Sequence, residues 1–195
     1  MHGSRQAPGR LRIIAGRLRG SKLSVPDAPG LRPTPERVRE TLFNWLAPTI
    51  DGAHCLDLYA GTGALGLEAL SRGAAHCVFV ERDAALARAL ADTLARLKVD
   101  TGEVVRGDAL SWLAQAGERR FDLVFVDPPF DADAWQATLH ALEQGGRLAL
   151  GAWIHVEASA EQAPAPPANW HLHREGRAGS VRHRLYRRDP APAPA

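Results

Sequence analysis

The sequence has few cysteines and no long apolar run, and these shortages exclude several classes of protein. Both cysteines, Cys55 and Cys77, lie in apolar segments, so we expect buried reduced thiols and not a disulfide framework or a metal pair. No apolar run approaches the roughly 18 residues of a membrane span, and the first ten residues lack an apolar signal region. The eight histidines form no metal-ligand pattern. We therefore expect a cytoplasmic protein without metal or membrane association, acting as a monomer.

Lysine is also scarce, because 22 of the 24 basic residues are arginines. The net charge of +2 hides a strong asymmetry along the chain. Residues 1–39 carry +7, residues 40–169 carry −9 and residues 170–188 carry +5. Basic ends on an acidic body favour a polyanionic partner, such as a nucleic acid, held beside an acidic site. The alternative is an arginine-rich surface that is simply solvated.

The stretch from Leu56 to Glu68 predicts a binding site for a nucleotide-like ligand. A short apolar run leads into Gly61-Thr62-Gly63, and a helical apolar pattern follows. Glycines at 61, 63 and 66 would allow positive φ and close approach of a ligand, and the helix start would offer unpaired N–H groups. The pattern by itself is weak, since glycines there could equally serve tight packing of a strand against a helix.

The remaining chain predicts a doubly wound α/β domain with additions at both ends. Residues 12–25 alternate loosely and indicate a basic β-hairpin turning near 19–21, and Thr34-Pro35-Glu36 resembles a helix start, with Thr34 as N-cap. That helix would run to about Leu46. Alternating strands and helices demand right-handed crossovers and a mostly parallel sheet. The expected strands are 54–58, 77–81, 103–106, 121–126 and 153–157, and the expected helices are 64–72, 84–98, 109–116 and 132–144. Two further strands, 170–175 and 180–187, joined through Gly176 and Gly179, imply an antiparallel edge.

Three acids follow the first three strands of this expected sheet. Asp57, Glu81 and Asp108 would meet in one crevice, because the carboxyl ends of parallel strands lie at one edge. Glu81 stands twenty residues after Gly61, an offset that suits an acid accepting hydrogen bonds from ribose hydroxyls. A structural alternative, in which an acid caps the following helix, is open for Asp83 and Asp108.

Strand 121–126 is followed by Asp127-Pro128-Pro129-Phe130. Two prolines fix φ and donate no N–H, so they would hold a carboxylate and a carbonyl rigidly at the mouth of the crevice, with an aromatic ring beside them. Two acceptors and a ring suit an amino group on a planar heterocycle.

Together these motifs resemble the S-adenosylmethionine-dependent methyltransferases that act on amino groups. The resemblance rests on Asp57-Leu-Tyr-Ala-Gly-Thr-Gly63, Glu81, Gly107-Asp-Ala109 and Asp127-Pro-Pro-Phe130. The segments from Arg12 to Leu46 and from Val181 to Arg188 are similar to the bacterial 16S ribosomal RNA guanine-N2 methyltransferase family.

The resemblance implies a Rossmann-like, seven-stranded fold and a role for each motif. It implies a catalytic set of Asp127, Pro128, Pro129 and Phe130. It implies a set that binds S-adenosylmethionine, namely Asp57, Tyr59, Ala60, Gly61, Thr62, Gly63, Glu81, Arg82, Asp108 and Ala109. The cations expected to contact RNA are Arg17, Arg19, Lys22, Arg32 and Arg37.

The reaction implied is methyl transfer to the N2 amine of a guanine in 16S rRNA, within the small ribosomal subunit. We expect a disordered basic head over 1–11, an RNA-binding hairpin and helix over 12–50, a methyltransferase domain over 51–188 and a disordered tail over 189–195. Two other functions stay open. A nicotinamide-dependent oxidoreductase would use the same glycines and Glu81, and a non-catalytic RNA-binding assembly factor could keep the fold.

Overall fold

The computed structural model describes five stretches of the chain. These are residues 11–24, 34–115, 117–128, 134–159 and 165–189. The predictions made for residues 1–10, the connector 25–33, Pro129, Phe130 and the tail after Asp189 lie outside them.

Seven strands form one sheet in the order β3-β2-β1-β4-β5-β7-β6. The elements are α1 (Glu36–Leu46), β1 (His54–Asp57), α2 (Ala64–Ser71), β2 (His76–Glu81), α3 (Ala84–Leu97), β3 (Gly102–Arg106), α4 (Ala109–Leu113), β4 (Phe121–Val126), α5 (Ala134–Gln144), β5 (Leu148–Ser159), β6 (Trp170–Ala178) and β7 (Val181–Arg188). Strands β3, β2, β1, β4 and β5 are parallel, and β7 pairs antiparallel with both β5 and β6. The predicted Rossmann-like sheet with an antiparallel edge is confirmed.

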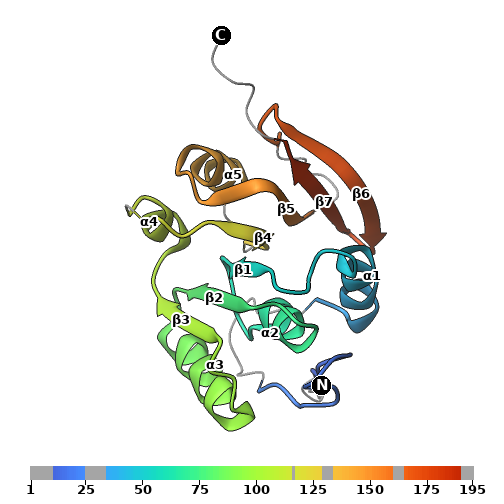
Figure 1. Ribbon diagram of the computed structural model, residues 1–195, viewed down its shortest axis with the longest axis vertical. Helices are drawn as coiled ribbons and strands as arrows, with labels where there is room; N and C mark the ends of the chain where they lie inside the picture. Colours follow the sequence, from blue (N-terminus) through green and yellow to red (C-terminus); the bar gives the residue numbers. More distant parts are fainter. Residues whose placement is uncertain (1–10, 25–33, 116, 129–133, 160–164, 190–195) are drawn as a thin grey trace, which may run out of the picture.

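Helices cover both faces of this sheet (Figure 1), with α1, α2 and α3 on one side and α4 and α5 on the other. Each face has its own apolar cluster. Leu42, Leu67 and Leu90 pack on the first face, whereas Leu113 and Leu139 pack on the second. The crossovers therefore bury the sheet on both sides, as a parallel sheet requires. Cys55 and Cys77 are free and fully buried between neighbouring strands, as predicted.

Strand β5 begins five residues before the predicted start. It runs from Leu148, and its pairing with β4 shifts register between Phe121 and Leu123. Gly151, with φ of 71°, lies where the alternation of apolar residues breaks. Gly176 is inside β6 and not in the connecting turn, which is formed at Gly179.

The start of α1 also differs from the prediction, because Thr34 is not its N-cap. Pro35 holds that position, and its carbonyl accepts from the N–H groups of Val38 and Arg39. The Thr34 hydroxyl donates instead to Glu157 Oε2 at 3.3 Å, 123 residues away in the chain. Thr34 therefore connects the start of α1 to β5.

The N-terminal hairpin is present, although its strand pairing is reduced to a single bridge between Arg12 and Lys22. It packs along α2 through the buried carboxylate of Glu68, which accepts from the N–H groups of Ile14 and Ala15 at 2.8 and 3.0 Å. Ser71, one turn further, accepts from the Arg17 N–H at 2.8 Å through its carbonyl. The hairpin is thus anchored to the C-terminal half of α2.

Glu68 also forms ion pairs with two arginines, one from α1 and one that directly follows α2. Arg72 donates to it at 2.8 Å, and Arg39 Nη1 lies 3.6 Å from Glu68 Oε2 with both side chains inaccessible to solvent. Arg39 donates to the Arg12 carbonyl at 2.9 Å through its other terminal nitrogen. Within the described residues, no helix is long and apolar enough to cross a membrane.

Candidate functional site

The turn between β1 and α2 has the geometry that the glycine pattern predicts. Gly61 and Gly63 take φ of 52° and 73°, which favour glycine over other residues. Gly63 is the N-cap of α2 and offers no side chain to cap its N–H groups. Gly66 has a different role, since it is helical and a Cβ there would lie 2.2 Å from the Phe79 ring. The small size of Gly66 allows α2 to pack closely against β2. This is the packing role that the sequence analysis left open for these glycines.

Glu81 ends β2 beside this turn. One carboxylate oxygen accepts from the Gly61 N–H at 2.7 Å, and the other accepts from the Asp83 N–H at 2.7 Å. A carboxylate offers about four lone-pair sites, so two such contacts leave acceptor capacity at the crevice. The structure therefore brings Glu81 to the glycine turn, as predicted, and shows that it also shapes the turn.

Asp57 ends β1 and is almost fully buried. Its carboxylate accepts from the Gly66 N–H at 3.0 Å, which locks the first turn of α2 onto the strand. Burial raises the pKa of Asp57 to about 7, a shift opposed by the Gly66 hydrogen bond and reinforced by Glu81. Contact between Asp57 and a cofactor stays a prediction.

Asp108 lies at the same edge of the sheet, because the N–H of Gly107 donates to the Glu81 carbonyl at 3.0 Å. It is exposed and caps α4 by accepting from the Ser111 N–H at 2.9 Å. That hydrogen bond holds the pKa of Asp108 below its usual range. Asp83 and Asp108 therefore both cap the helix that follows them, as the structural alternative predicted. Capping also leaves Asp108 as an anion at this edge of the sheet.

The other predicted cofactor residues border this turn. Tyr59 is tied to α5 by a 2.6 Å hydrogen bond between its hydroxyl and that of Thr138. Ala60 and Thr62 are buried within the turn, Arg82 is exposed after β2, and Ala109 is the buried first residue of α4.

Asp127 follows β4 directly, next to β1. Asp57 pairs with Phe125, so Asp127 lies two residues beyond Asp57 along the sheet. Asp127 is partly buried and Pro128 is buried. Burial raises the pKa of Asp127 well above its usual value, and Glu157 and Asp57 add to the shift because they are like charges.

Glu157, near the end of β5, was missed by sequence reasoning. Val126 pairs with Val156, so Asp127 and Glu157 occupy the next opposed positions on adjacent parallel strands. Glu157 is 6% exposed and accepts from the Thr34 hydroxyl. Burial raises the pKa of this carboxyl as well, and the hydrogen bond from Thr34 opposes the shift. The available signal was an acid among apolar residues at the carboxyl end of a buried strand.

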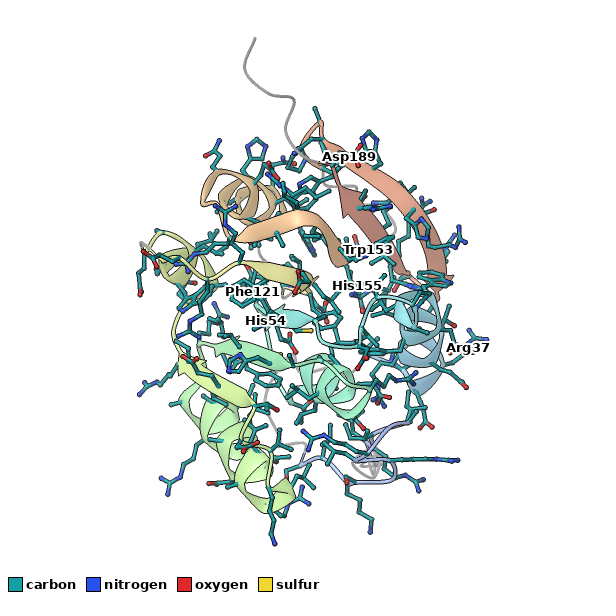
Figure 2. All side chains as sticks on the ribbon, viewed as in Figure 1. Arg37, His54, Phe121, Trp153, His155 and Asp189 are labelled. Carbon is teal, nitrogen blue, oxygen red and sulfur yellow. The ribbon has the colours of Figure 1, made fainter. Side chains whose placement is uncertain are left out.

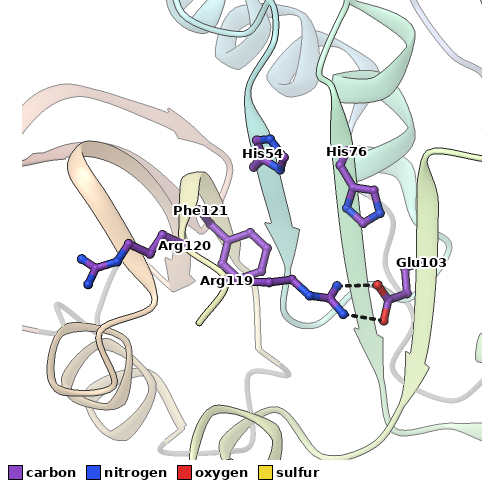
Figure 3. A pocket seen from close by; sticks show the side chains of 6 residues that line it. All are labelled: His54, His76, Glu103, Arg119, Arg120 and Phe121. Atoms are coloured by element: carbon purple, nitrogen blue, oxygen red, sulfur yellow. Dashed lines mark hydrogen bonds and ion pairs between the residues drawn. The ribbon is translucent and has the colours of Figure 1, made fainter. Parts of the chain in front are cut away.

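A shallow pocket of about 490 Å³ lies at the opposite end of the sheet (Figure 3). His54, His76 and Phe121 line it, and these are the first residues of β1, β2 and β4. Arg119 pairs with Glu103 across it. Ligands of open α/β sheets bind outside the carboxyl ends of the strands. The glycine turn is therefore the candidate site, and this pocket is not.

The predicted RNA-contacting cations are exposed where the structure describes them. Arg17, Arg19 and Lys22 are exposed on the hairpin, although Arg17 Nε also donates to the Leu70 carbonyl of α2 at 3.5 Å. Arg37 points outward from α1 (Figure 2). Arg32 lies outside the described residues. The C-terminal hairpin is partly neutralised, since Glu175 pairs with Arg182 and Arg184 and Glu143 pairs with Arg188.

Comparison with known proteins places the chain in one family. The family model described as conserved hypothetical protein 95 matches residues 11–187. Ribosomal RNA small subunit methyltransferase D of Escherichia coli K12 is 54% identical over 182 residues, which cover 93% of this chain and 91% of that protein. The chain belongs to this methyltransferase family.

Further members support the assignment. Methyltransferase D of Haemophilus influenzae is 43% identical over 183 residues, covering 92% of this chain and 95% of that protein. A solved structure named "Putative methyltransferase yhhF from Escherichia coli" superposes with a TM-score of 0.87 at 50% identity, and the match covers 94% of this chain and all of that one. A family of methyltransferases leaves the oxidoreductase alternative without support.

The residues at the glycine turn fit S-adenosylmethionine. The positive-φ glycines permit close backbone approach, the start of α2 presents N–H groups, and Glu81 retains acceptor capacity for a ribose diol. Asp108 adds an exposed anion at the same edge. These donors and acceptors match the amino acid and ribose portions of such a molecule.

Proposed function

We propose that this protein transfers a methyl group from S-adenosylmethionine to the N2 amine of a guanine in 16S rRNA, within the small ribosomal subunit. The observation that carries the proposal is the position of Asp127-Pro128 after β4, adjacent to the β1 turn with its two positive-φ glycines. Relatives named as small subunit rRNA methyltransferases support the RNA substrate. The amino group as target comes from the resemblance of the Asp-Pro-Pro-Phe motif, and the guanine and its N2 position come from the resemblance of the segments from Arg12 to Leu46 and from Val181 to Arg188.

Asp127 orients the amine in this proposal. An exocyclic amine is a poor nucleophile, because its lone pair is delocalised into the ring. Hydrogen bonds from the amine to the Asp127 carboxylate and the Pro128 carbonyl would favour a pyramidal nitrogen in line with the methyl group. Phe130 would stack on the extruded base. S-adenosylmethionine, when bound, supplies a methyl group activated on a sulfonium sulfur.

The polar residues of the turn hold the cofactor, and they are separate from the amine-binding group. Glu81 would accept hydrogen bonds from the ribose hydroxyls, and the positive-φ backbone at Gly61 and Gly63 would let the amino acid portion approach the start of α2 closely. The exposed hairpin cations would bind phosphates, with Arg37 nearer the start of α1.

The decisive experiment offers the purified protein S-adenosylmethionine with a labelled methyl group, together with small ribosomal subunits or naked rRNA. Nucleoside mass spectrometry then identifies the modified base. N2-methylguanosine at one nucleotide supports the proposal. Label on another base or on another position of guanine would overturn it. A protein that binds the subunit and transfers no label would support the alternative of a non-catalytic assembly factor.

A further inference from the structure

Glu157 is a buried acid with no part in the reaction outlined above. It lies near the carboxyl end of β5, the strand next to β4, and only 6% of it is exposed. An isolated buried carboxylate is costly, so such a group is expected to be paired, hydrogen-bonded or protonated. Two titratable groups face it from neighbouring strands, namely the acid Asp127 after β4 and His183, its register partner on β7.

The geometry makes these two acids neighbours. In-register pairing of Val126 with Val156 puts Asp127 opposite Glu157 at the end of the ladder, and adjacent strands lie about 4.8 Å apart. Opposed residues of parallel strands point to the same face. Asp57 on β1 is the other titratable group that faces Asp127 within the described residues.

Two further contacts fix Glu157 itself. The Thr34 hydroxyl donates to Oε2 at 3.3 Å and so stabilises the ionised form of the side chain. The backbone carbonyl of Glu157 accepts from the Trp135 indole N–H of α5 at 2.8 Å, which holds this end of β5 in place. Thr34 lies two residues before the first residue of α1.

We propose that Glu157, held by Thr34, is a positioning residue that keeps Asp127 able to take the proton released by the substrate amine. This inference rests on the proposed function of Asp127. As the bond between N2 and the methyl carbon forms, the carbon–sulfur bond breaks and its electrons stay on sulfur. The nitrogen loses one proton as this bond forms, and the Asp127 carboxylate accepts that proton before passing it to water.

Glu157 influences that step because its negative charge lies next to Asp127. A like charge disfavours the ionised form of Asp127 and makes it a stronger base. A base is most effective when its pKa lies near the working pH. Burial raises the pKa of both acids, that of Glu157 to about 7, and the hydrogen bond from Thr34 limits the rise at Glu157, so Glu157 carries its charge over a wider pH range than it would without Thr34.

The test uses Glu157→Gln, which keeps the shape and removes the charge. In this variant the acid limb of the kcat profile should move about one unit to lower pH. The plateau kcat should fall about tenfold because Asp127 becomes a weaker base, whereas KM for small subunits should stay within about twofold. An independent readout is the ¹³C carboxyl titration of Asp127 in the free protein, which should shift in the same direction.

Thr34→Val provides a second variant. Without the hydroxyl, Glu157 is protonated more easily and exerts less charge on Asp127, so the acid limb and the Asp127 titration should shift the same way by a smaller amount. The double variant should shift no further than Glu157→Gln, because coupled sites are not additive. Thr93→Val, which removes a buried α3 hydroxyl bonded to Ala89, and Glu143→Gln, which breaks the pair with Arg188, are matched controls that should leave both readouts unmoved.

The failures can be told apart. An unmoved acid limb and carboxyl titration in folded Glu157→Gln, with methyl transfer intact in the wild type, would overturn the role of Glu157 and leave the proposed function standing. If Glu157→Gln does not fold, the same null result in Thr34→Val overturns it. Absence of N2 methylation by the wild type overturns the function itself.

Discussion

Glu81 Oε2 accepts a hydrogen bond of 2.7 Å from the Gly61 N–H, so the acid that ends β2 directly supports the glycine turn that follows β1. The two residues stand twenty positions apart and come from neighbouring parallel strands. The contact means that this acid both builds the proposed cofactor site and faces it.

Glu81→Ala should weaken S-adenosylmethionine binding by at least about 1.5–3 kcal/mol, through loss of charge-assisted hydrogen bonds to the ribose. Glu81→Gln should lose less, because one amide oxygen can still accept. Titration calorimetry measures both affinities, with Glu40→Ala on the exposed side of α1 as control. An unchanged affinity in Glu81→Ala would show that the side chain has no contact with the cofactor.

Replacing Arg17, Arg19 and Lys22 with glutamine should reduce the salt dependence of subunit binding. Each phosphate contact contributes about 0.7–0.9 to the log–log slope, so the triple variant should lose roughly two to three units. Cofactor affinity should survive, since the hairpin is anchored to the C-terminal half of α2, away from the turn at Gly63.

A matched control for that experiment replaces Arg88, Arg106 and Arg120, three exposed cations on the acidic body. Binding measured across salt concentrations compares the two triple variants. Equal slopes in both would mean that the hairpin cations are merely solvated.

Glu68→Ala should destabilise the fold strongly. It would leave the Arg39 guanidinium buried without its counter-charge and release the hairpin from α2. Breaking a buried ion pair typically costs about 3–5 kcal/mol. Urea unfolding measures the change. Glu103→Ala, which removes an exposed pair with Arg119, should cost under about 1 kcal/mol, and similar values for the two variants would contradict the role given to Glu68.

His155 should make the fold sensitive to acid. It is fully buried, and its ring nitrogens have no hydrogen-bond partner in the described parts of the chain. Burial, reinforced by His183, lowers the pKa of His155 to about 3. Below about pH 6.5, His155 is therefore protonated in the unfolded chain but stays neutral in the folded chain. The free energy of unfolding falls as the pH drops from about 6.5 towards 3.

His155→Leu should remove this contribution. Between pH 7 and pH 5 the wild type should lose about 2 kcal/mol more than the variant, at roughly 1.4 kcal/mol per pH unit below 6.5. The buried acids change the stability in the opposite direction as the pH falls. Because both proteins contain these acids, their contribution cancels in the comparison. Denaturant unfolding at both pH values measures the difference, with the exposed His54→Leu as control. Equal acid losses in wild type and His155→Leu would refute this assignment.

The sequence predicted the parallel part of the fold closely, because buried strands and amphipathic helices have distinct periodicities. Strand β4 has the predicted bounds, and the acids that end β1 and β2 do lie at the same edge as the acid that follows β3. The start of β5 could not be found, since Gly151 and the register shift break its pattern.

Sequence analysis also failed to predict which charged residues are buried. Arg39 and Glu68 sit on helix positions where charge predicts exposure, and only their mutual contact makes burial tolerable. The Thr34–Glu157 contact joins residues 123 positions apart, and no local pattern encodes it. A capping threonine before a proline was the natural local interpretation, and tertiary structure gave its hydroxyl another acceptor.

The central claim is that Asp127 orients and deprotonates the guanine amine, and Asp127→Ala tests it most directly. Labelled methyl transfer to small subunits should fall at least about 10²–10³-fold, while calorimetric affinity for S-adenosylmethionine stays within about tenfold. Asp122→Ala, at the other end of β4 where Asp122 accepts from the His54 N–H, is the matched control and should retain turnover. Near wild-type formation of N2-methylguanosine by Asp127→Ala would contradict the account.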